Sequence, residues 1–236
     1  MKAIRLSFFQ MIEMMRRDMM LLVSCLAPIF VGFFFRFAIP FLDAILMGCF
    51  HMAAILSPYY KLVDILFANL TPIMFCFVSA MVSLEETDEK IAVYLFITPL
   101  GKTGYIFARF GVTAIIAFFV TIILLPFFKL TDLPLITILL LAVGGTLQGL
   151  IVVLLVLTIS SNKLEGMAVA KLSMLPVFGA AIPFFIKSNV QYAASPLPSF
   201  WIGKAIIENM SLYLLPALVL SVVWICFLLK WYLHKI

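Results

Sequence analysis

Residues 133–159 read LPLITILLLAVGGTLQGLIVVLLVLTI, a stretch without one charged side chain. A helix that crosses the roughly 30 Å hydrocarbon core of a bilayer needs about 20 apolar residues at about 1.5 Å per residue, and this stretch exceeds that length. Five further segments have a similar apolar character, namely Met19–Pro40, Tyr60–Val82, Gly104–Phe128, Gly166–Ile186 and Leu212–Tyr232. Because lipid offers the backbone no hydrogen-bond partner, all six segments are expected to be helices.

The composition of the whole chain agrees with this interpretation. Hydrophobic residues make up 65% of the 236 residues and charged residues 11%, whereas soluble domains are roughly 45–50% apolar and about 25% charged. Six helices and their connections use nearly the whole length, so no room remains for a soluble catalytic or nucleotide-binding domain. We predict an all-α polytopic membrane protein with one domain over residues 1–236. Because the basic residues are dispersed at helix ends, the net charge of +5 does not indicate a nucleic-acid partner.

The same basic residues indicate the orientation of the spans. Placing the N-terminus in the cytoplasm puts eleven of the 16 Lys and Arg residues on the inner side and five on the outer side. The inner residues are Lys2, Arg5, Arg16, Arg17, Lys90, Lys102, Arg109, Lys163, Lys171, Lys230 and Lys235. The outer residues are Arg36, Lys61, Lys129, Lys187 and Lys204. Since cytoplasmic loops accumulate Lys and Arg, and an even number of spans puts both termini on one side, we predict a multi-pass cell-membrane protein with both termini cytoplasmic.

Two segments outside the spans are also apolar. Residues 1–18 carry apolar side chains at helical spacing, at Ile4, Phe8, Met11 and Met15. Most charges of this segment lie on the other side, at Lys2, Arg5, Glu13 and Arg16. This pattern predicts an amphipathic helix in the cytoplasmic interface; the alternative is a basic flank that only orients the first span.

Residues 188–211 are too apolar for a free loop and contain Trp201, which favours the lipid–water boundary, so we expect one or two short helices that dip into the outer leaflet.

A few polar residues fall within the predicted spans. Asn69 and Gln148 either line a transport pathway or form hydrogen bonds between helices. Arg36 and Asp64 lie near the outer ends of their spans, where they either form an ion pair or, for Arg36, extend to the interface. No catalytic or metal-binding residue is predicted: the four cysteines lack a metal-site spacing, and the two histidines lie on opposite sides of the predicted bilayer.

Glycine and proline mark special positions in three spans. Gly145 and Gly149 form a small-xxx-small pattern that allows close helix packing, either within the chain or between subunits. Pro72 in the second span and Pro176 and Pro183 in the fifth are expected to kink their helices. Such breaks either line a pathway, as in some transporters, or are ordinary features of membrane helices.

The inner loop differs from all other connections, with the sequence SLEETDEKIAVYLFITPLGKTG at residues 83–104. Ser83 and Glu86 match a capping box, which predicts a helix that begins at the inner end of the second span. The acids at its start complement the positive end of the helix dipole, and they are Glu85, Glu86, Asp88 and Glu89. The apolar stripe of this helix consists of Ile91, Tyr94 and Leu95, and its end is marked by Thr98, Pro99, Leu100 and Gly101. An amphipathic helix outside the membrane indicates a contact with another protein.

Gly101-Lys-Thr103 matches the end of a phosphate-binding P-loop, but the match is incomplete. That motif requires a glycine five residues before Gly101, and this position is Phe96. The soluble α/β domain that carries such loops also has no room in this chain. We therefore expect no nucleotide or other cofactor on the chain itself.

With these features together, the chain resembles the membrane subunits of ABC exporters of the second permease type, which move drugs, peptides and polysaccharides. The resemblance covers almost the whole chain. It rests on the interfacial N-terminal helix, the six spans with both ends inside, and the acidic cluster that runs into Thr98-Pro99-Leu100. It rests further on the inner loop at residues 160–166 before a proline-containing fifth span, and on the apolar outer segment before the sixth.

The resemblance implies a coupling segment at residues 83–103 that docks on a separate ATPase subunit, which binds ATP and magnesium. The residues that it assigns to this contact are Glu85, Glu86, Asp88, Glu89, Tyr94, Leu95, Thr98, Pro99 and Leu100. Many relatives carry a basic residue and a glycine among the acids, where this chain has Thr87 and Lys90. The resemblance also implies a second permease copy, identical or a sibling, beside the contact with membrane lipid.

These observations predict a permease that exports an amphiphilic or lipophilic substrate, such as a drug, an antimicrobial peptide or a lipid-like molecule. The direction of transport follows from the resemblance alone. Two other classes remain open. One is a membrane immunity or sensory protein that uses the same fold without transport. The other is an intramembrane enzyme, which would need convergent catalytic groups that the sequence does not display.

Overall fold

The computed structural model describes residues 2–51 and 54–235, and within these ranges it is helical without strands. The elements of the first half are α1 (Lys2–Arg17), α2 (Met19–Phe33), the π-helix η1 (Phe34–Ala38), α3 (Ile39–Phe50), η2 (Ser57–Tyr59), α4 (Tyr60–Asp88), α5 (Ile91–Ile97), α6 (Gly101–Ile106), the π-helix η3 (Phe107–Gly111) and α7 (Val112–Phe128). The elements of the second half are α8 (Leu135–Ile159), α9 (Lys163–Ser173), η4 (Leu175–Ala181), α10 (Ile182–Phe185), η5 (Asn189–Ala194), α11 (Pro198–Ile207), η6 (Ser211–Tyr213) and α12 (Leu214–Lys235). The elements η2, η4, η5 and η6 are short 3₁₀ helices.

Six helical stretches in the described part of the chain are long and apolar enough to cross a membrane. They are Met19–Phe50, Ser57–Asp88, Gly101–Phe128, Leu135–Ile159, Lys163–Phe185 and Leu214–Lys235. The predicted all-α fold with six spans is thus confirmed. The predicted ends at Pro40 and Val82 are wrong, because the helices continue to Phe50 and Asp88. Pro40 is accommodated because it follows the wider turn of η1, in which the helical hydrogen bonding is already displaced.

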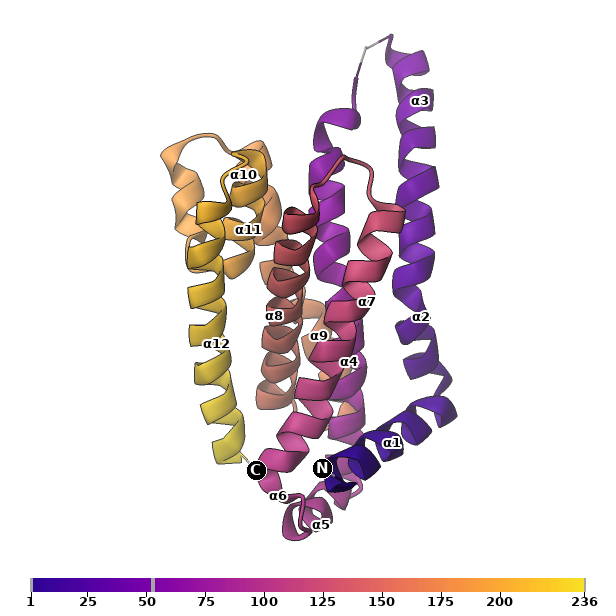
Figure 1. Cartoon of the computed structure of the whole chain (residues 1–236), viewed down its shortest axis with the longest axis vertical. Coiled ribbons are helices and arrows are strands. Elements are labelled where there is room, and N and C mark those ends of the chain that lie inside the picture. Colours follow the sequence, from indigo (N-terminus) through magenta and orange to yellow (C-terminus); the bar gives the residue numbers. More distant parts are fainter. Residues whose placement is uncertain (1, 52–53, 236) are drawn as a thin grey trace.

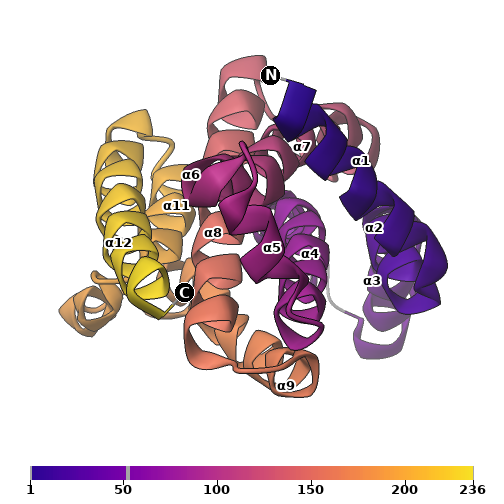
Figure 2. The same cartoon turned by 90° about the horizontal axis from the view of Figure 1, so that it is seen from below.

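The long helix α4 is the centre of the bundle. It packs against α8, α7 and α2, and Figure 2 shows it enclosed by these helices. Of its most apolar 18 residues, 72% are buried inside the chain, compared with 11% for the stretch that combines α2, η1 and α3. A helix that packs against neighbours on several sides needs no separate polar face, and the buried residues of α4 accordingly extend along its length from Leu62 to Glu86.

The helices α4 and α8 pack closely against each other at the two predicted glycines. A Cβ atom on Gly145 would lie 2.4 Å from the carbonyl oxygen of Ala68, and one on Gly149 would lie 3.0 Å from that of Pro72. Of the two alternatives for this pattern, the structure places the contact within one chain. Helices in lipid associate mainly through such close packing, since the surrounding tails are as apolar as the side chains.

The predicted prolines interrupt the fifth span but not the second. The fifth span is divided into α9, η4 and α10, with Pro176 and Pro183 at the first turns of the last two elements. The helix α4 continues through Pro72 without a break, and the kink expected there stays a prediction. Pro72 packs against Gly145 of α8, and this close contact holds the helix on both sides of the proline.

The apolar segment before the last span forms two short helices, η5 and α11, as predicted for residues 188–211. The helix α11 packs on η4 and α12 and is largely buried, including the aliphatic stem and the amine of Lys204. This amine bonds to the hydroxyl of Tyr192, lies 4.0 Å from the centroid of the Tyr192 ring and lies 3.7 Å from a carboxylate oxygen of Glu208. Trp201 donates a hydrogen bond of 2.8 Å to the carbonyl of Ser195 and closes the segment on itself.

Arg36 and Asp64 do not pair with each other, so the predicted alternative of an ion pair is wrong. Arg36 donates to the carbonyl oxygen of Lys129 at 2.5 Å. Asp64 accepts from the backbone amides of Leu130 and Thr131 at 2.7 and 3.0 Å. Both side chains therefore fix the same connection, between α7 and α8, because its free backbone groups are better partners than a second side chain.

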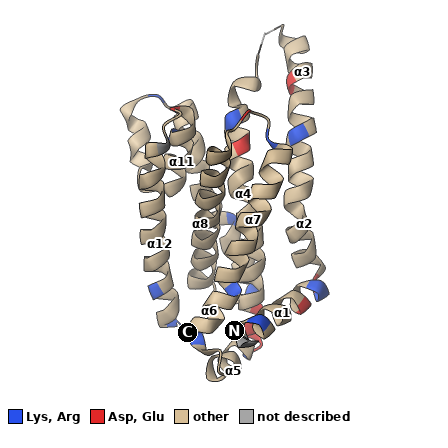
Figure 3. Cartoon of the chain, viewed as in Figure 1, with Lys and Arg blue, Asp and Glu red and all other residues tan. Residues whose placement is uncertain are grey.

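The first and last helices lie at the same end of the bundle, which we call the N/C end; the opposite end is the far end (Figure 1). The amphipathic helix predicted for residues 1–18 is present as α1, with Met11 buried and Phe8 and Met15 packed on the core. Lys and Arg residues gather along α1 and at the end of α12 (Figure 3). At the end of α12, the Lys235 amine donates to the carbonyls of Leu157 and Thr158 and so caps α8.

We expect G145A to lower the free energy of unfolding in detergent by about 1–3 kcal/mol, because the added methyl group meets a backbone carbonyl that cannot move aside. Thermal unfolding of the purified protein measures this change. G48A is the matched control, since a Cβ atom there meets nothing within 4 Å. This control should be neutral or slightly stabilising; equal behaviour of the two variants would show that the α4–α8 contact is not close-packed.

Candidate functional site

The N/C end of the bundle carries a short helical protrusion, α5, which Figure 1 shows below the spans. The sequence explains its shape. The chain turns out of α4 at Lys90, whose φ is 60°, and turns into α6 at Gly101, whose φ is 64°. Thr98 ends α5 as predicted, because its hydroxyl donates to the carbonyl of Leu95 at 2.6 Å and its backbone is extended before Pro99.

The surface of α5 is apolar where it meets solvent. Val93, Tyr94 and Ile97 have exposed fractions of 61%, 68% and 80%. Of the remaining predicted contact residues, Glu89, Thr98 and Pro99 are exposed, Leu95 is half-buried and Leu100 is buried. We call Val93, Tyr94 and Ile97 the apolar tip. The tip shares only Tyr94 with the stripe predicted from the sequence, because Ile91 and Leu95 turn toward the bundle.

The predicted helix start at Ser83 is wrong. Ser83 is buried inside α4, which continues to Asp88, so the acids lie at the C-terminal end of a helix and not at its beginning. The negative end of the helix dipole repels carboxylates, and these acids therefore need cations nearby. Two cations supply this compensation from elsewhere in the chain, and they are Arg109 and Lys163.

Glu86 and Arg109 form an ion pair that is shielded from solvent on all sides. The guanidinium donates to both carboxylate oxygens, with a distance of 3.0 Å from Nε to Oε2, and its third contact is the carbonyl of Ser7 at 2.5 Å. The hydroxyl of Tyr105 adds a hydrogen bond of 2.8 Å to Glu86. The pair thereby joins α1, α4, α6 and η3. A buried pair offsets its desolvation only with this degree of hydrogen bonding.

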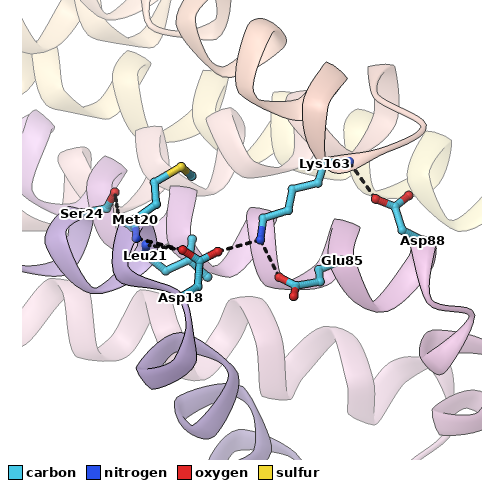
Figure 4. Close-up of polar contacts among 7 residues, drawn as sticks. All are labelled: Asp18, Met20, Leu21, Ser24, Glu85, Asp88 and Lys163. Carbon is cyan, nitrogen blue, oxygen red and sulfur yellow. Dashed lines mark hydrogen bonds and ion pairs between the residues drawn. The ribbon is translucent and has the colours of Figure 1, made fainter.

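Lys163, the first residue of α9, connects three helices (Figure 4). Its amine lies 2.7 Å from a carboxylate oxygen of Asp18 and 2.7 Å from one of Glu85, and its backbone amide donates to Asp88 at 3.0 Å. Asp18 also caps α2 by accepting from the amide of Met20 at 2.8 Å. We call Asp18, Glu85, Asp88 and Lys163 the Lys163 cluster. The hydrogen bond from Lys163 holds the pKa of Asp18 below its ordinary value, so this carboxylate stays charged.

The acids of the predicted contact therefore serve different purposes. Glu85, Glu86 and Asp88 bind partners inside the chain, and among the four only Glu89 extends into solvent without a hydrogen bond or ion pair to a described residue. Sequence reasoning missed Asp18 and Lys163 as members of this site. The sequence does contain a signal for both residues. Asp18 is an N-cap residue that predicts the start of α2, and Asn162 is an N-cap residue that predicts the start of α9 at Lys163.

Asn69 and Gln148 lie far from this cluster along the chain, in α4 and α8, and both are buried, with exposed fractions of 1% and 2%. The side-chain nitrogen of Asn69, Nδ2, donates a hydrogen bond of 2.9 Å to the carbonyl of Ile65 in its own helix. Its oxygen and the amide nitrogen of Gln148 have no partner in the described part of the chain. Their predicted place on a pathway stays a prediction.

A groove of about 350 Å³ lies between α2 and α9, with α4 as its back wall. Its lining is formed by Met20, Ser24, Met74, Phe77, Met167, Ala170, Lys171 and Met174. We call it the methionine groove. The Lys163 cluster fixes the first residues of both helices that form its sides, because Asp18 caps α2 and Lys163 begins α9. Methionine side chains are flexible and polarizable, so such a groove adapts to apolar ligands of different shape.

Residues 11–233 match the family model of the Rv2686c-like fluoroquinolones export permease proteins. The chain belongs to this family. The fluoroquinolones export permease proteins MT2760 and Rv2686c, from the CDC 1551 / Oshkosh and H37Rv strains of Mycobacterium tuberculosis, are each 25% identical to it over 150 residues. This alignment covers 62% of the chain and 60% of the length of each relative. No solved structure matches the chain.

Membership of the Rv2686c-like permease family confirms the resemblance to export permeases that the sequence indicated. The six spans and this membership together make the chain a membrane protein. Over residues 2–51 and 54–235, no group of three His, Cys, Asp or Glu side chains comes together that could hold a metal ion.

We expect R109M to lower the free energy of unfolding by about 3–5 kcal/mol, because it leaves the carboxylate of Glu86 buried without its compensating cation. Denaturant or thermal unfolding in detergent measures the loss. The double variant E86M/R109M should recover much of it, since it removes both charges at once. E89Q, which changes an exposed acid of the same segment, is the control and should differ from the parent by no more than about 0.5 kcal/mol. A small effect of R109M would mean that water reaches the pair.

Proposed function

We propose that this chain is the membrane subunit of an ATP-driven exporter, and that its N/C end faces the cytoplasm. The apolar tip of α5 carries the proposal. Three large apolar side chains are exposed on the short helix that protrudes below the ends of the spans. Exposed apolar groups gathered at one place on a surface mark a site of contact with another protein. The orientation is supported by the Lys and Arg residues near this end, which cytoplasmic loops favour.

The partner at the tip is a separate ATPase subunit, to which ATP and magnesium bind. The chain itself carries no cofactor. Membership of a permease family and the position of α5 between the second and third spans support this assignment. Tyr94 and Ile97 are the anchors of the contact, Val93 and Pro99 extend it, and Glu89 is the one acid of the segment that is free to meet a cation of the partner. A second permease, identical or a sibling, completes the transporter.

Movement of the ATPase reaches the spans through the two polar contacts at the base of α5. The Glu86–Arg109 pair connects the end of α4 to α1 and to the start of the third span. The Lys163 cluster connects the same end of α4 to α2 and α9. A displacement of α5 therefore changes the spacing of α2 and α9, which are the walls of the methionine groove. Binding of nucleotide favours one of two arrangements of these helices, and transport follows the shift between them.

The substrate in this proposal binds in the methionine groove and is an amphiphile with an apolar ring system and an anionic group. The flexible apolar lining accepts the ring system, and Lys171 at the edge of the groove supplies a cation. The relatives in Mycobacterium tuberculosis are named for the export of fluoroquinolones. A fluoroquinolone, which carries a carboxylate on an aromatic ring system, fits this description.

We expect I97E to abolish co-purification with the partner ATPase, because a carboxylate cannot be desolvated in an apolar contact. Pull-down of the ATPase by the tagged permease measures the complex, with the amount of membrane-inserted permease as reference. V190E introduces the same charge at an exposed apolar position of η5 at the far end and should leave the complex intact. Retention of the ATPase by I97E would remove α5 as the docking element.

We expect K163M to leave the complex assembled while substrate efflux falls at least about tenfold, because the end of α4 then loses the amine that connects Glu85 to Asp18. Efflux from cells and ATP turnover of the purified complex are measured side by side. K163R keeps the cation and should retain most of the efflux. If K163M exports normally, the Lys163 cluster does not transmit the movement, although docking at the tip could still hold.

A further inference from the structure

The far end contains a second cavity, distinct from the methionine groove, with a volume of about 300 Å³. It lies where α4, α8 and α12 begin and α11 ends. The residues of its lining that matter for its chemistry are Lys61, Asp132, Asn209, Ile136, Leu140 and Leu214. The first three are polar and the last three are apolar. The cavity is therefore divided into a charged part and an apolar part, which is the character of a site for an amphiphile.

The charged part contains one cation and one anion. The amine of Lys61 donates a hydrogen bond of 3.3 Å to the side-chain oxygen of Asn209, which leaves its other two protons for a ligand. Asp132 is exposed and forms no ion pair with a residue of the described chain. Opposite charges in one cavity, not bonded to each other, are complementary to a ligand that carries both charges itself.

The depth of the cavity identifies the source of such a ligand. The helices α4 and α8 begin at Tyr60 and Leu135, so the charges next to them lie at the level where a span leaves the hydrocarbon and meets the headgroups. Leu135 and Ile136 are largely exposed and continue from the cavity along α8 toward the hydrocarbon. In the first turn of α8, the amides of Thr137 and Ile138 donate to the carbonyl of Pro134, and those of Leu135 and Ile136 have no such helical bond among the described residues, at the positive end of the helix dipole.

We propose that this cavity binds a zwitterionic phospholipid with a primary amine, phosphatidylethanolamine, from the leaflet at the far end. Lys61 and the first turn of α8 hold the phosphate, and Asp132 accepts hydrogen bonds from the ammonium. An acyl chain lies along Ile136 and Leu140. A primary ammonium is preferred over choline because three methyl groups on nitrogen leave no proton to donate. The proposal does not depend on the function at the N/C end.

The occupied site has a structural effect on the connection between α11 and α12. Asn209 lies in this connection with a φ of 51°, a conformation that few residues other than glycine and asparagine adopt. Its side chain bonds to Lys61, and Lys61 in turn would bond to the phosphate. In this proposal the bound lipid therefore stabilises the left-handed conformation of Asn209 and, with it, the connection between α11 and α12.

The experiment measures lipid binding to the purified protein by native mass spectrometry and by thermal unfolding in detergent. Phosphatidylethanolamine, phosphatidylcholine and phosphatidylglycerol with identical acyl chains are added separately. We expect the parent to bind phosphatidylethanolamine most tightly, and K61Q and D132N each to weaken that binding about tenfold, the weight of one charge-assisted hydrogen bond. K61R keeps the cation and should retain binding. K187Q removes an exposed cation that is not part of the cavity and is the matched control.

Three results would overturn the proposal. The first is equal binding of the three lipids by the parent. The second is unchanged binding of phosphatidylethanolamine by both K61Q and D132N. The third is equal protection by phosphoethanolamine, which lacks acyl chains, or by a zwitterionic fluoroquinolone, because either would assign the cavity to a soluble zwitterion in place of a lipid.

Discussion

A glutamate and an arginine without access to water hold the N/C end of this protein together. Glu86 belongs to the central helix and Arg109 to the wider turn η3, and the guanidinium also reaches α1 at the carbonyl of Ser7. Two isolated charges at this depth would cost several kcal/mol each, so neither helix can leave the contact without the other. Because α1, α4, α6 and η3 meet at this pair, α5 has a rigid base, and we expect a displacement of α5 to move the spans as well.

The remainder of the bundle depends on shape more than on charge. The glycines of α8 bring two backbones together near the middle of the second and fourth spans, where in lipid neither hydrophobic transfer nor ion pairing supplies much energy. The first span has little of this packing and lies mostly outside the core. It is held by a few polar contacts, at its start by Asp18, near its middle by Arg36 in η1, and in α3 by Asp43, which accepts hydrogen bonds from Leu56, Ser57 and Tyr60. A helix held by a few polar contacts and loosely packed between them is free to move relative to α9, as the proposed transport cycle requires.

The sequence was sufficient for the six spans, for α1 and for the short helices before the last span, because each follows from length or local periodicity. It was misleading at residues 83–89. A serine three residues before a glutamate predicts a helix start, yet in the structure this segment ends a helix. The carboxylates are compensated by cations that lie 23 residues away for Glu86 and 78 for Glu85. No local pattern contains such partners. Of the three residues of the apolar tip, Tyr94 alone was predicted from the sequence. The face of α5 that is covered depends on its contact with Tyr105 of α6, which no local pattern of α5 contains.

The turn η3 has a consequence for how this chain tolerates changes in length. Its widened ring holds the carbonyl of Arg109 between two hydroxyls, those of Ser79 and Thr113, each at 2.6 Å. A π-turn holds one residue more than an α-turn, so deleting one residue among 107–111 would convert η3 to an ordinary α-helical turn and leave the helix after it in nearly the same orientation. The lipid-facing and inward-facing sides of the third span would then keep their places. At these positions the third span can therefore lose one residue in length without losing its register, provided that Arg109 itself is kept.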